Sequence, residues 1–352
     1  MKRPASTLPT ARAPKLSTVA KAAQVSTGLA SRVLNNDPTV SVRDETRRRV
    51  QAAAEQLHYG PSASARALRH QRTKVIGLAV HDLASTLVID LLEGARGEAT
   101  SHDYLLLLTD ADEIASNESS RSLYLHGARI DGLIIQDGHA NLGAAIDEIA
   151  EQMPTVVFNT RGRALCPGVQ VDEGLTGRLA AEHLLQAGHR RIGFIGGPEG
   201  TYTNSARLQG ATAPIIAAGG TLDSLHGDWS APSGLSSLRQ LLTTAPQTTG
   251  VITGNVLIGT GAMAAAVEMG RPVPETLSIV SIQDSWAVDF TTPKLTTVAL
   301  PLAELGRQAV RTLLAYIDGD DVPDSQIIAD APEVRSRQSV AAPAVLTPET
   351  NH

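Results

Sequence analysis

Positively charged side chains are concentrated at one end of this 352-residue chain. Residues 1–74 contain 14 lysines and arginines and 4 aspartates and glutamates, a net charge of +10. Residues 75–352 contain 16 and 32 of them, a net charge of −16, so the overall charge of −6 hides a strong asymmetry. Lysine and arginine neutralise phosphates and release condensed counterions, which drives salt-dependent binding to DNA. The pattern indicates a nucleic-acid-binding module attached to a larger acidic domain.

The elements that must position this basic chemistry begin with residues 16–35, where apolar residues follow a helical period. The spacing predicts one short helix over about 17–24 and a second over about 27–34. Ser17 and Ser26 are the predicted N-caps of these helices. Two short helices joined by a tight turn form a helix-turn-helix unit, whose second helix lies in the major groove of DNA. Any small helical hairpin has this spacing, and the basic surroundings favour the DNA-binding interpretation.

The composition also limits the class of protein. The one cysteine, Cys166, excludes an internal disulfide framework and fits a reducing compartment. The first 15 residues lack the apolar segment of a secretory signal, and no apolar run approaches the ~18 residues of a membrane span. We therefore expect a cytoplasmic protein without a membrane partner. Residues 259–264 (GTGAMA) formally match a dinucleotide fingerprint but fall inside a helical pattern, so we expect no enzyme activity, no cofactor and no metal site.

From residue 74 onward, short strand patterns alternate with helical ones. Strands are predicted over 74–80, 104–109, 129–136 and 154–158, then over 169–172, 191–197, near 225, 249–253 and 278–284. Helices are predicted over 87–99, 118–126 and 141–151, then over 174–187, 203–218, 233–243 and 256–269. This alternation predicts parallel sheets with helices on both faces, in two lobes that begin near residues 74 and 169. Ligands of open α/β sheets bind outside the carboxyl ends of the strands, so a small molecule would lie between the lobes.

Several sequence motifs occur in a recognisable collinear order. They are VAKAAQVS, SRVLN, VRDETRRRV, AAAEQLHYGP and ARAL, followed by VIGLAV, RIDGLII, EHLLQAGHRRIGFIGGP, RLQG, GDWSAPSG, TTPKLTTV and LAELGRQA. Through them, residues 16–340 resemble the LacI/GalR family of bacterial transcription regulators. The resemblance implies an N-terminal three-helix helix-turn-helix headpiece with a hinge helix, then an α/β two-lobed periplasmic-binding-protein-like core with parallel sheets. It also implies a homodimer on near-palindromic double-stranded operator DNA and a small-molecule effector, possibly a carbohydrate.

The resemblance and the composition together predict five segments. They are a disordered arm (1–14), a helix-turn-helix DNA-binding domain (15–60), a hinge helix and linker (61–73), a two-lobed effector-binding and dimerisation domain (74–340) and a flexible tail (341–352). Within the DNA-binding domain a third helix is expected over about 43–58, with Arg47, Arg48 and Arg49 facing outward or near a phosphate backbone. A short hinge helix is expected over about 63–69, and such a helix is not stable alone in water.

The resemblance places seven residues at the DNA. They are Ser26, Thr27, Gly28, Ser31, Arg32, Asn35 and, in the hinge, Leu68. Arg32 is the expected base reader, because a guanidinium can bond guanine O6 and N7 together. The serines suit phosphates, and Leu68 occupies the position from which the family inserts a wedge into the minor groove. Gly28 has no side chain to read a base, so specificity should rest on Thr27, Arg32 and Leu68.

The resemblance places another seven residues around the effector. They are His81, Asp82, Asn159, Arg207, Trp229, Asn255 and Gln283. Arg207 is expected to direct its forked donors at a ligand hydroxyl pair or carboxylate. Trp229 offers a flat apolar face for a sugar ring, although a tryptophan of the core or lobe edge is the competing interpretation. Gln283 stands where the family has an acidic ligand contact, which favours a different hydroxyl pattern or a different class of ligand.

These observations predict a transcriptional regulator that acts as a repressor. A ligand between the lobes is expected to control its operator affinity allosterically. One alternative is a ligand-independent DNA-binding regulator with a degenerate pocket. A solute-binding protein shares the two-lobed core but would need a signal peptide and no basic headpiece. An NAD-dependent enzyme is the remaining alternative, and it rests on the misplaced glycine motif alone.

Overall fold

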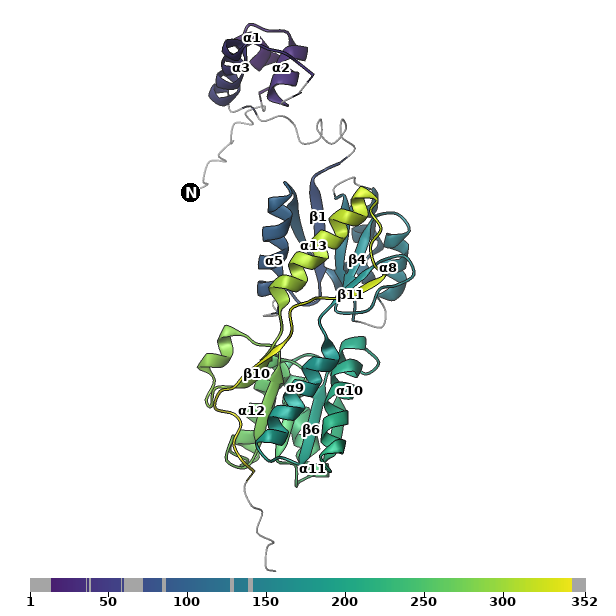
Figure 1. Cartoon of the computed structure of the whole chain (residues 1–352), viewed down its shortest axis with the longest axis vertical. Coiled ribbons are helices and arrows are strands. Elements are labelled where there is room, and N and C mark those ends of the chain that lie inside the picture. The colour runs from purple at the N-terminus through teal and green to yellow at the C-terminus, as the bar shows by residue number, and fades with distance from the viewer. Residues whose placement is uncertain are drawn as a thin grey trace, which may run out of the picture. The chain divides into compact units, whose positions relative to one another are not determined.

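The computed structural model describes residues 14–35, 37, 39–57, 59, 72–83, 87–126, 130–138 and 142–343. The chain divides into two compact units, Met1–Thr73 and Lys74–His352 (Figure 1). The predicted hinge helix and Leu68 lie outside the described residues, as does the predicted arm up to residue 13. Among the described residues, no helix combines the length and the apolar character needed to cross a membrane.

The first unit contains three short helices, α1 (Leu16–Ala22), α2 (Thr27–Leu34) and α3 (Asp44–Gln56). The predicted bounds of α2 are confirmed, and the Ser26 hydroxyl caps it by accepting a hydrogen bond from the backbone N–H of Leu29 at 3.2 Å. The buried residues that join the three helices are Val19, Ala20, Ala23, Ala30, Val33, Val50, Ala53 and Ala54. Small apolar residues at helical spacing therefore build this core, as the periodicity predicted.

The predicted N-cap at Ser17 is wrong. Helix α1 begins at Leu16, so Ser17 lies inside its first turn, and Lys15 occupies the N-cap without a side-chain hydrogen bond. Leu16 packs against the headpiece core, which favours including it in the helix. The turn that follows depends on Gln24, which adopts a left-handed conformation with φ of 52°.

The first lobe of the second unit is a six-stranded sheet in the order β11-β5-β4-β3-β1-β2. Its strands are β1 (Val75–Val80), β2 (Leu105–Asp110), β3 (Gly132–Gln136), β4 (Thr155–Phe158), β5 (Gly168–Gln170) and β11 (Ser325–Ile327). Helices α5 (Leu87–Ser101) and α13 (Leu302–Asp318) lie side by side on one face (Figure 1). The opposite face carries α6 (Ala111–Ser116) and α8 (Gly143–Ala150), and α7 (Glu118–His126) contacts α6. All strand pairs of this sheet are parallel.

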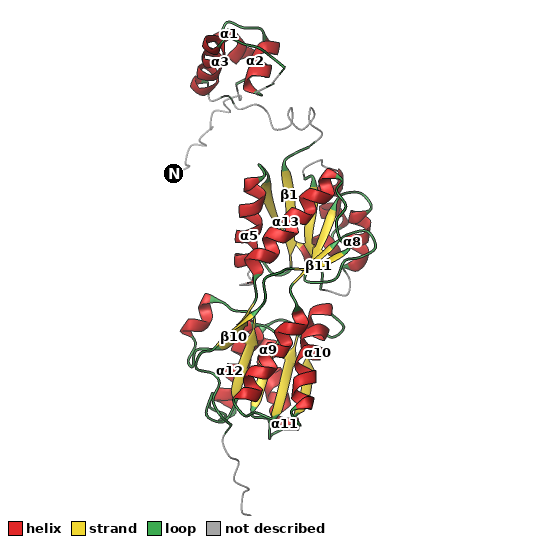
Figure 2. Ribbon diagram, in the orientation of Figure 1, coloured by secondary structure: helices red, strands yellow, loops and turns green. Residues whose placement is uncertain are grey.

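The second lobe repeats this arrangement with the order β12-β10-β9-β8-β6-β7 (Figure 2). Its strands are β6 (Arg191–Gly196), β7 (Thr221–His226), β8 (Gly250–Thr253), β9 (Ser278–Ile282), β10 (Thr296–Ala299) and β12 (Glu333–Arg335). Its helices are α9 (Glu173–Gln186), α10 (Tyr202–Ala217), α11 (Ala231–Thr244), α12 (Val256–Glu268) and the 3-10 helix η1 (Trp286–Phe290). Helices α9 and α10 cover one face, and α11 and α12 cover the other. The edge strand β12 pairs antiparallel with β10, so this sheet is mixed.

The two lobes are not consecutive segments of chain. The strand expected to open the second lobe, residues 169–172, is in fact β5 of the first sheet, where it pairs with β4. No helix separates β4 from β5. The regular alternation of strands and helices is interrupted at this point, and the interruption resembled the beginning of a second lobe. The chain then leaves the first lobe before α9, returns at α13 and leaves again after β11, so it crosses between the lobes three times. The sequence analysis assigned no element to 296–335.

The end of the second unit is tied to the second sheet. The His189 ring, 1% exposed, lies with Nδ1 2.9 Å from Thr249 Oγ1 and Nε2 2.9 Å from the carbonyl of Ala341. The hydroxyl of Ser278 also donates to this carbonyl, at 3.2 Å. The predicted flexible tail was placed from residue 341, whereas Ala341 is anchored by these bonds; residues from 344 onward lie outside the described part.

Candidate functional site

The outer face of α2 carries the candidate DNA-binding residues. Thr27, Gly28 and Arg32 are exposed, while Ala30 and Val33 on the opposite face are buried. Among the described residues, the side chains of Thr27 and Arg32 have no hydrogen-bond partner, so their polar side-chain atoms are available to a second molecule. The helix therefore separates a packing face from a face that can contact DNA.

The remaining residues predicted for this surface stabilise the helix itself. Ser26 is its N-cap. The Asn35 amide donates to the backbone carbonyl of Ser31 at 2.8 Å and contacts the Ser31 hydroxyl at 3.4 Å, which closes the carboxyl end. Leu29 packs, partly buried, against the headpiece core.

One headpiece arginine has a structural contact that the sequence did not indicate. Arg49 Nε donates to the backbone carbonyl of Ala23 at 2.8 Å and so satisfies an acceptor just after the carboxyl end of α1. Arg48 is exposed on the same helix. The expected outward orientation therefore holds for Arg48 and Arg49, which are both exposed, whereas Arg47 is half-buried; Arg49 in addition joins α3 to α1.

A cavity of about 330 Å³ lies between residues of both lobes, and we call it the interlobe cavity. All seven predicted effector residues line it: His81, Asp82, Asn159, Arg207, Trp229, Asn255 and Gln283. Other polar residues of its wall were not predicted from the sequence: Asp112, Gln136, Asp137, Thr201, Thr203, Asp228 and Ser230. Most of the missed residues follow a strand or begin a helix, so strand ends were their only signal in the sequence.

The first lobe contributes a set of connected polar groups. The His81 ring lies with Nδ1 2.9 Å from Asp112 Oδ1, and the His81 backbone N–H donates to Gln136 Oε1 at 3.0 Å. Arg163 reaches Asp137 Oδ2 at 3.3 Å and binds Asp147 through two bonds of 2.9 Å. The hydrogen bond from Arg163 lowers the pKa of the Asp147 carboxyl.

Three of the predicted cavity residues have left-handed backbones at the carboxyl ends of strands. Their φ angles are 49° for Asp82 after β1, 61° for Asn159 after β4 and 70° for Gln283 after β9. Residues other than glycine rarely adopt this conformation, and it occurs preferentially at ligand sites. The Asn159 carbonyl also accepts a hydrogen bond from Thr203 Oγ1 at 2.9 Å, which joins the first lobe to α10 of the second.

The expected role of Arg207 needs correction. Its fork is already bound inside the protein, because Nε and Nη2 donate to the two carboxylate oxygens of Glu173 at 2.6 and 2.9 Å. Nη1 donates to the backbone carbonyl of Gly254 at 2.7 Å. The forked donors of Arg207 therefore point at Glu173, not at the cavity, although the residue still forms part of the cavity wall.

The ring of Trp229 lies flat against the backbone of two glycines. A Cβ atom added to Gly197 would come within 2.3 Å of its ring, and one added to Gly254 within 3.1 Å. The Asn255 amide donates to the Trp229 carbonyl at 2.9 Å, and Asn255 Oδ1 caps α12 by accepting from Ile258 at 2.8 Å. Asn255 thus positions the tryptophan and the helix, and both ends of its amide are used within the fold.

Gln283 presents a polar atom with no partner. The side chain is 4% exposed, and its buried Nε2 finds no hydrogen-bond acceptor among the described residues. A buried unpaired donor is costly, so a ligand that accepts from it would relieve that cost. Among the cavity residues, Gln283 is therefore the clearest candidate for a direct ligand contact.

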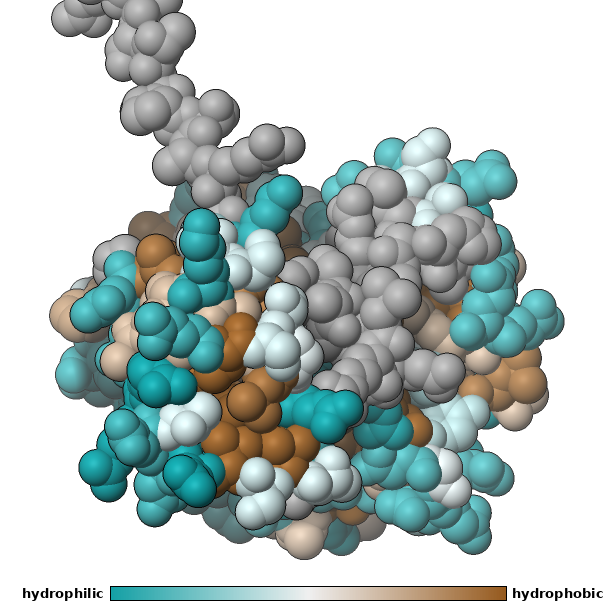
Figure 3. Space-filling view, turned by 90° about the horizontal axis from the view of Figure 1, so that it is seen from above, coloured by the Kyte–Doolittle hydropathy of each residue, from teal (hydrophilic) through white to brown (hydrophobic). Residues whose placement is uncertain are grey.

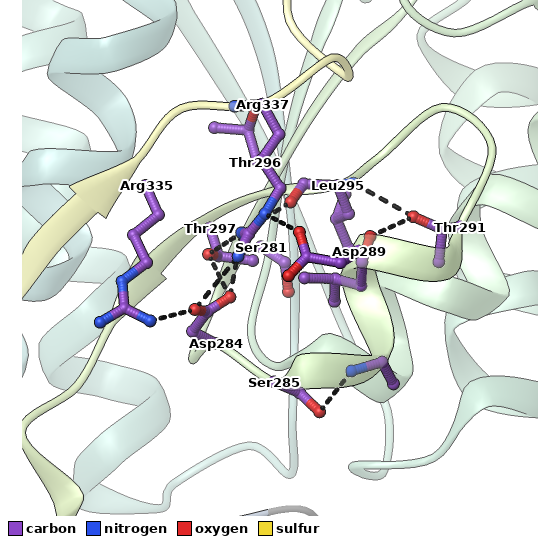
Figure 4. Close-up of polar contacts among 12 residues, drawn as sticks. Ser281, Asp284, Ser285, Asp289, Thr291, Leu295, Thr296, Thr297, Arg335 and Arg337 are labelled. Carbon is purple, nitrogen blue, oxygen red and sulfur yellow. Dashed lines mark hydrogen bonds and ion pairs between the residues drawn. The ribbon is translucent and has the colours of Figure 1, made fainter.

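The residue after Gln283 is held firmly (Figure 4). The Asp284 carboxylate accepts from Thr297 Oγ1 at 2.8 Å, from Arg335 Nη1 at 2.6 Å and from Arg337 Nη2 at 3.2 Å. These bonds lower the pKa of the Asp284 carboxyl against the opposing effect of burial. Because Asp284 is fixed to β10 and β12, the backbone of Gln283 is fixed at the wall of the cavity.

Family models match both units of the chain. A model described as bacterial regulatory proteins, lacI family, matches residues 15–62. A second, described as a periplasmic binding protein-like domain, matches residues 181–340.

Individual proteins are similar over nearly the whole length. The HTH-type transcriptional repressor PurR of Edwardsiella ictaluri (strain 93-146) is 32% identical over 330 residues, covering 92% of this chain and 96% of the relative. The lac repressor dimer bound to operator and the anti-inducer ONPF has a TM-score of 0.80 at 25% identity, covering 94% and 99% of the two chains. A LacI family regulator from Enterococcus faecium with bound ribose has a TM-score of 0.66 at 26% identity, covering 76% and 99%.

Proposed function

The chain belongs to the LacI family of bacterial transcription regulators, and we propose that it represses transcription as a homodimer on near-palindromic operator DNA. In this proposal, α2 reads the operator through Thr27 and Arg32. The exposed outer face of α2 and the basic charge of the first 74 residues support this reading. A small molecule in the interlobe cavity, a sugar or related metabolite, controls DNA affinity.

The observation that carries the choice of ligand is the position of Trp229. Its indole lies against the backbones of Gly197 and Gly254, at the wall of a cavity rimmed by amide and carboxylate side chains. A flat apolar face beside many hydrogen-bonding groups suits a pyranose or furanose ring, which has apolar faces and polar edges. The unpaired Nε2 of Gln283 supplies one donor for a ligand oxygen.

Control of DNA affinity requires that a ligand bind two states of the protein unequally. The cavity is lined by both lobes, so a ligand there gains more contacts in one relative position of the lobes than in another. Coupling between two sites is typically ~1–3 kcal/mol. The chain crosses between the lobes three times, so three covalent connections can transmit a change in the relative position of the lobes.

A thermal-shift screen of the full chain with sugars, polyols and nucleosides tests the ligand proposal. We expect at least one neutral polyhydroxylated compound to raise the unfolding midpoint, because a ligand that binds the folded state stabilises it by mass action. Trp229→Ala should abolish that shift, whereas Trp286→Ala, a change at the exposed tryptophan outside the cavity, should preserve it. A screen without any hit would favour the ligand-independent regulator.

A further inference from the structure

The interlobe cavity has an unusual balance of charge. Its ionisable lining residues are four aspartates, one arginine and one histidine. The histidine, His81, lies 2.9 Å from Asp112, and the arginine, Arg207, is bound by Glu173, which lies behind the wall. The histidine and the arginine of the described lining therefore each already face a carboxylate of the protein itself.

The pair of Arg207 and Glu173 is almost completely removed from water. The Arg207 side chain is 4% exposed and the Glu173 side chain is 0% exposed. Two parallel hydrogen bonds, at 2.6 and 2.9 Å, join the guanidinium to the carboxylate in the geometry that is strongest for this pair. Because no solvent separates the two side chains, the negative charge of Glu173 offsets the positive charge of Arg207 at the position of a bound ligand. A ligand in the cavity can therefore accept a hydrogen bond from Arg207 but gains no net electrostatic attraction from it.

Glycines bring these two side chains together. Glu173 is the first residue of α9 and Arg207 lies on α10. A Cβ atom on Gly177 would lie 1.9 Å from the carbonyl oxygen of Arg207, and one on Gly210 would lie 2.0 Å from that of Gly174. The helices can touch because these side chains are missing. The amino end of α9 also favours a negative charge at Glu173.

From this arrangement we infer that Glu173 is the residue that makes the interlobe cavity reject anionic effectors. The inference rests on the proposed function and deepens it, because it restricts the effector to uncharged molecules and excludes sugar phosphates and other phosphorylated metabolites. Arginine has five N–H donors, and three of those of Arg207 are used by Glu173 and Gly254. The two others can still serve a neutral hydroxyl oxygen.

The test compares one neutral probe with its phosphorylated counterpart on the full chain. D-ribose and D-ribose 5-phosphate are titrated in a Trp286→Phe background, where Trp229 is the one remaining tryptophan and its fluorescence reports on the cavity. The Arg207 Cζ lies 5.9 Å from the Trp229 ring centroid, so charge near Arg207 is within range of this reporter. Inorganic phosphate at matched ionic strength serves as the third probe.

In protein with Glu173 unchanged, we expect no saturable response to D-ribose 5-phosphate or to phosphate. Glu173→Gln retains the shape of the side chain but leaves the charge of Arg207 uncompensated, and it should bind both anions at least tenfold more tightly. Adding Arg207→Gln to that variant should return anion affinity to its starting value. Tight binding of ribose 5-phosphate with Glu173 unchanged, or no gain in a folded Glu173→Gln protein, would overturn the inference.

The double variant keeps the inference testable if Glu173→Gln alone does not fold, because removing both charges of a buried pair is often tolerated. With both charges removed, the double variant, like the parent, should respond to D-ribose and show no saturable response to either anion. Saturable anion binding by the folded double variant would mean that Arg207 and Glu173 do not control the selection against anions and would contradict the inference. If neutral sugars never bind while Glu173→Gln gains phosphate binding, the role of Glu173 stands and the sugar proposal fails.

Discussion

The headpiece and the interlobe cavity hold their candidate functional side chains in opposite ways. On α2, the side chains of Thr27 and Arg32 are exposed and make no hydrogen bonds within the described protein. At the cavity, Arg207 and Gln283 are each 4% exposed, and Arg207 is bound on several sides. The α2 surface proposed to bind DNA therefore leaves its side chains exposed, whereas the interlobe cavity buries its side chains before a ligand binds.

This difference also separates binding from stability. If α2 contacts DNA as proposed, substitution of Thr27 or Arg32 removes a contact with DNA and no side-chain hydrogen bond of the described protein. Substitution of Arg207 breaks hydrogen bonds within the fold. On the face drawn in Figure 3, hydrophobic residues form a brown area bordered by hydrophilic residues. The two sites should therefore respond to mutation in different measurements.

The largest effect is expected for Arg207→Met. The change leaves the carboxylate of Glu173 buried without a partner, which typically costs ~3–5 kcal/mol. Urea unfolding of the full chain, monitored by far-UV circular dichroism, measures the loss. The matched control is Arg239→Met, which breaks the exposed pair with Glu268 and should cost at most ~1 kcal/mol. Equal losses of unfolding free energy in the two variants would show that the buried pair is no more important for stability than the exposed pair.

A smaller effect, confined to binding, is expected for Arg32→Ala. Loss of a bidentate base contact should reduce discrimination between operator and random DNA by ~1–3 kcal/mol. Salt dependence of binding should change only modestly, because phosphate contacts remain. Binding is measured on a site selected from random DNA, and urea unfolding should be unchanged since Arg32 is exposed. A variant with the parental ratio of operator to random affinity would remove Arg32 from base reading.

Glycine substitutions sharpen the comparison further. A Cβ atom on Gly28 has nothing within 4 Å, so Gly28→Ala should stabilise the headpiece by ~0.8–1 kcal/mol through helix propensity. Amide hydrogen exchange at Val50 in α3 measures this gain. At Gly261 in the core, a Cβ atom would lie 1.9 Å from the carbonyl oxygen of Ala231, so Gly261→Ala should destabilise its unit. If alanine stabilised the protein at both positions, the distinction between the open site at Gly28 and the crowded site at Gly261 would be refuted.

The smallest effect is a dependence of core stability on pH. Burial lowers the pKa of His189 below the 6.5 of the exposed side chain, so the folded state favours the neutral ring. Its contribution is therefore present above about pH 6.5 and lost as the pH falls and the unfolded chain binds the proton more readily. The unfolding midpoint measured from pH 7.5 to 5 should decline less steeply in His189→Gln. His183, whose pKa burial also lowers, sets the slope that remains.

Helix α2 and the seven cavity residues could be predicted for different reasons. The bounds of α2 followed from local periodicity and the Ser26 cap, both of which lie within a few residues. The cavity residues were identified through the family resemblance and the carboxyl ends of strands, and each of them lines the cavity. Their proposed ligand contacts remain predictions.

What could not be predicted depends on contacts between distant residues. Glu173 and Arg207 are 34 positions apart, on two helices, and no pattern in either segment pairs them. Asp112 lies on α6, which has six residues and is too short for a helical period to be visible. Placement of β5, α13 and β11 in the first lobe also required knowledge of which sheet accepts each segment.

The three crossings between the lobes have a consequence for how such proteins can exchange parts. Neither lobe is encoded by one continuous stretch, because the first combines 75–170 with 302–327 and the second takes most of the remainder. A single recombination event inside the core would join incomplete lobes from two parents. A breakpoint near residues 73 and 74, between the two compact units, would leave both intact. Gene exchange can thus reassign the operator of an intact ligand sensor far more easily than it can assemble a new sensor.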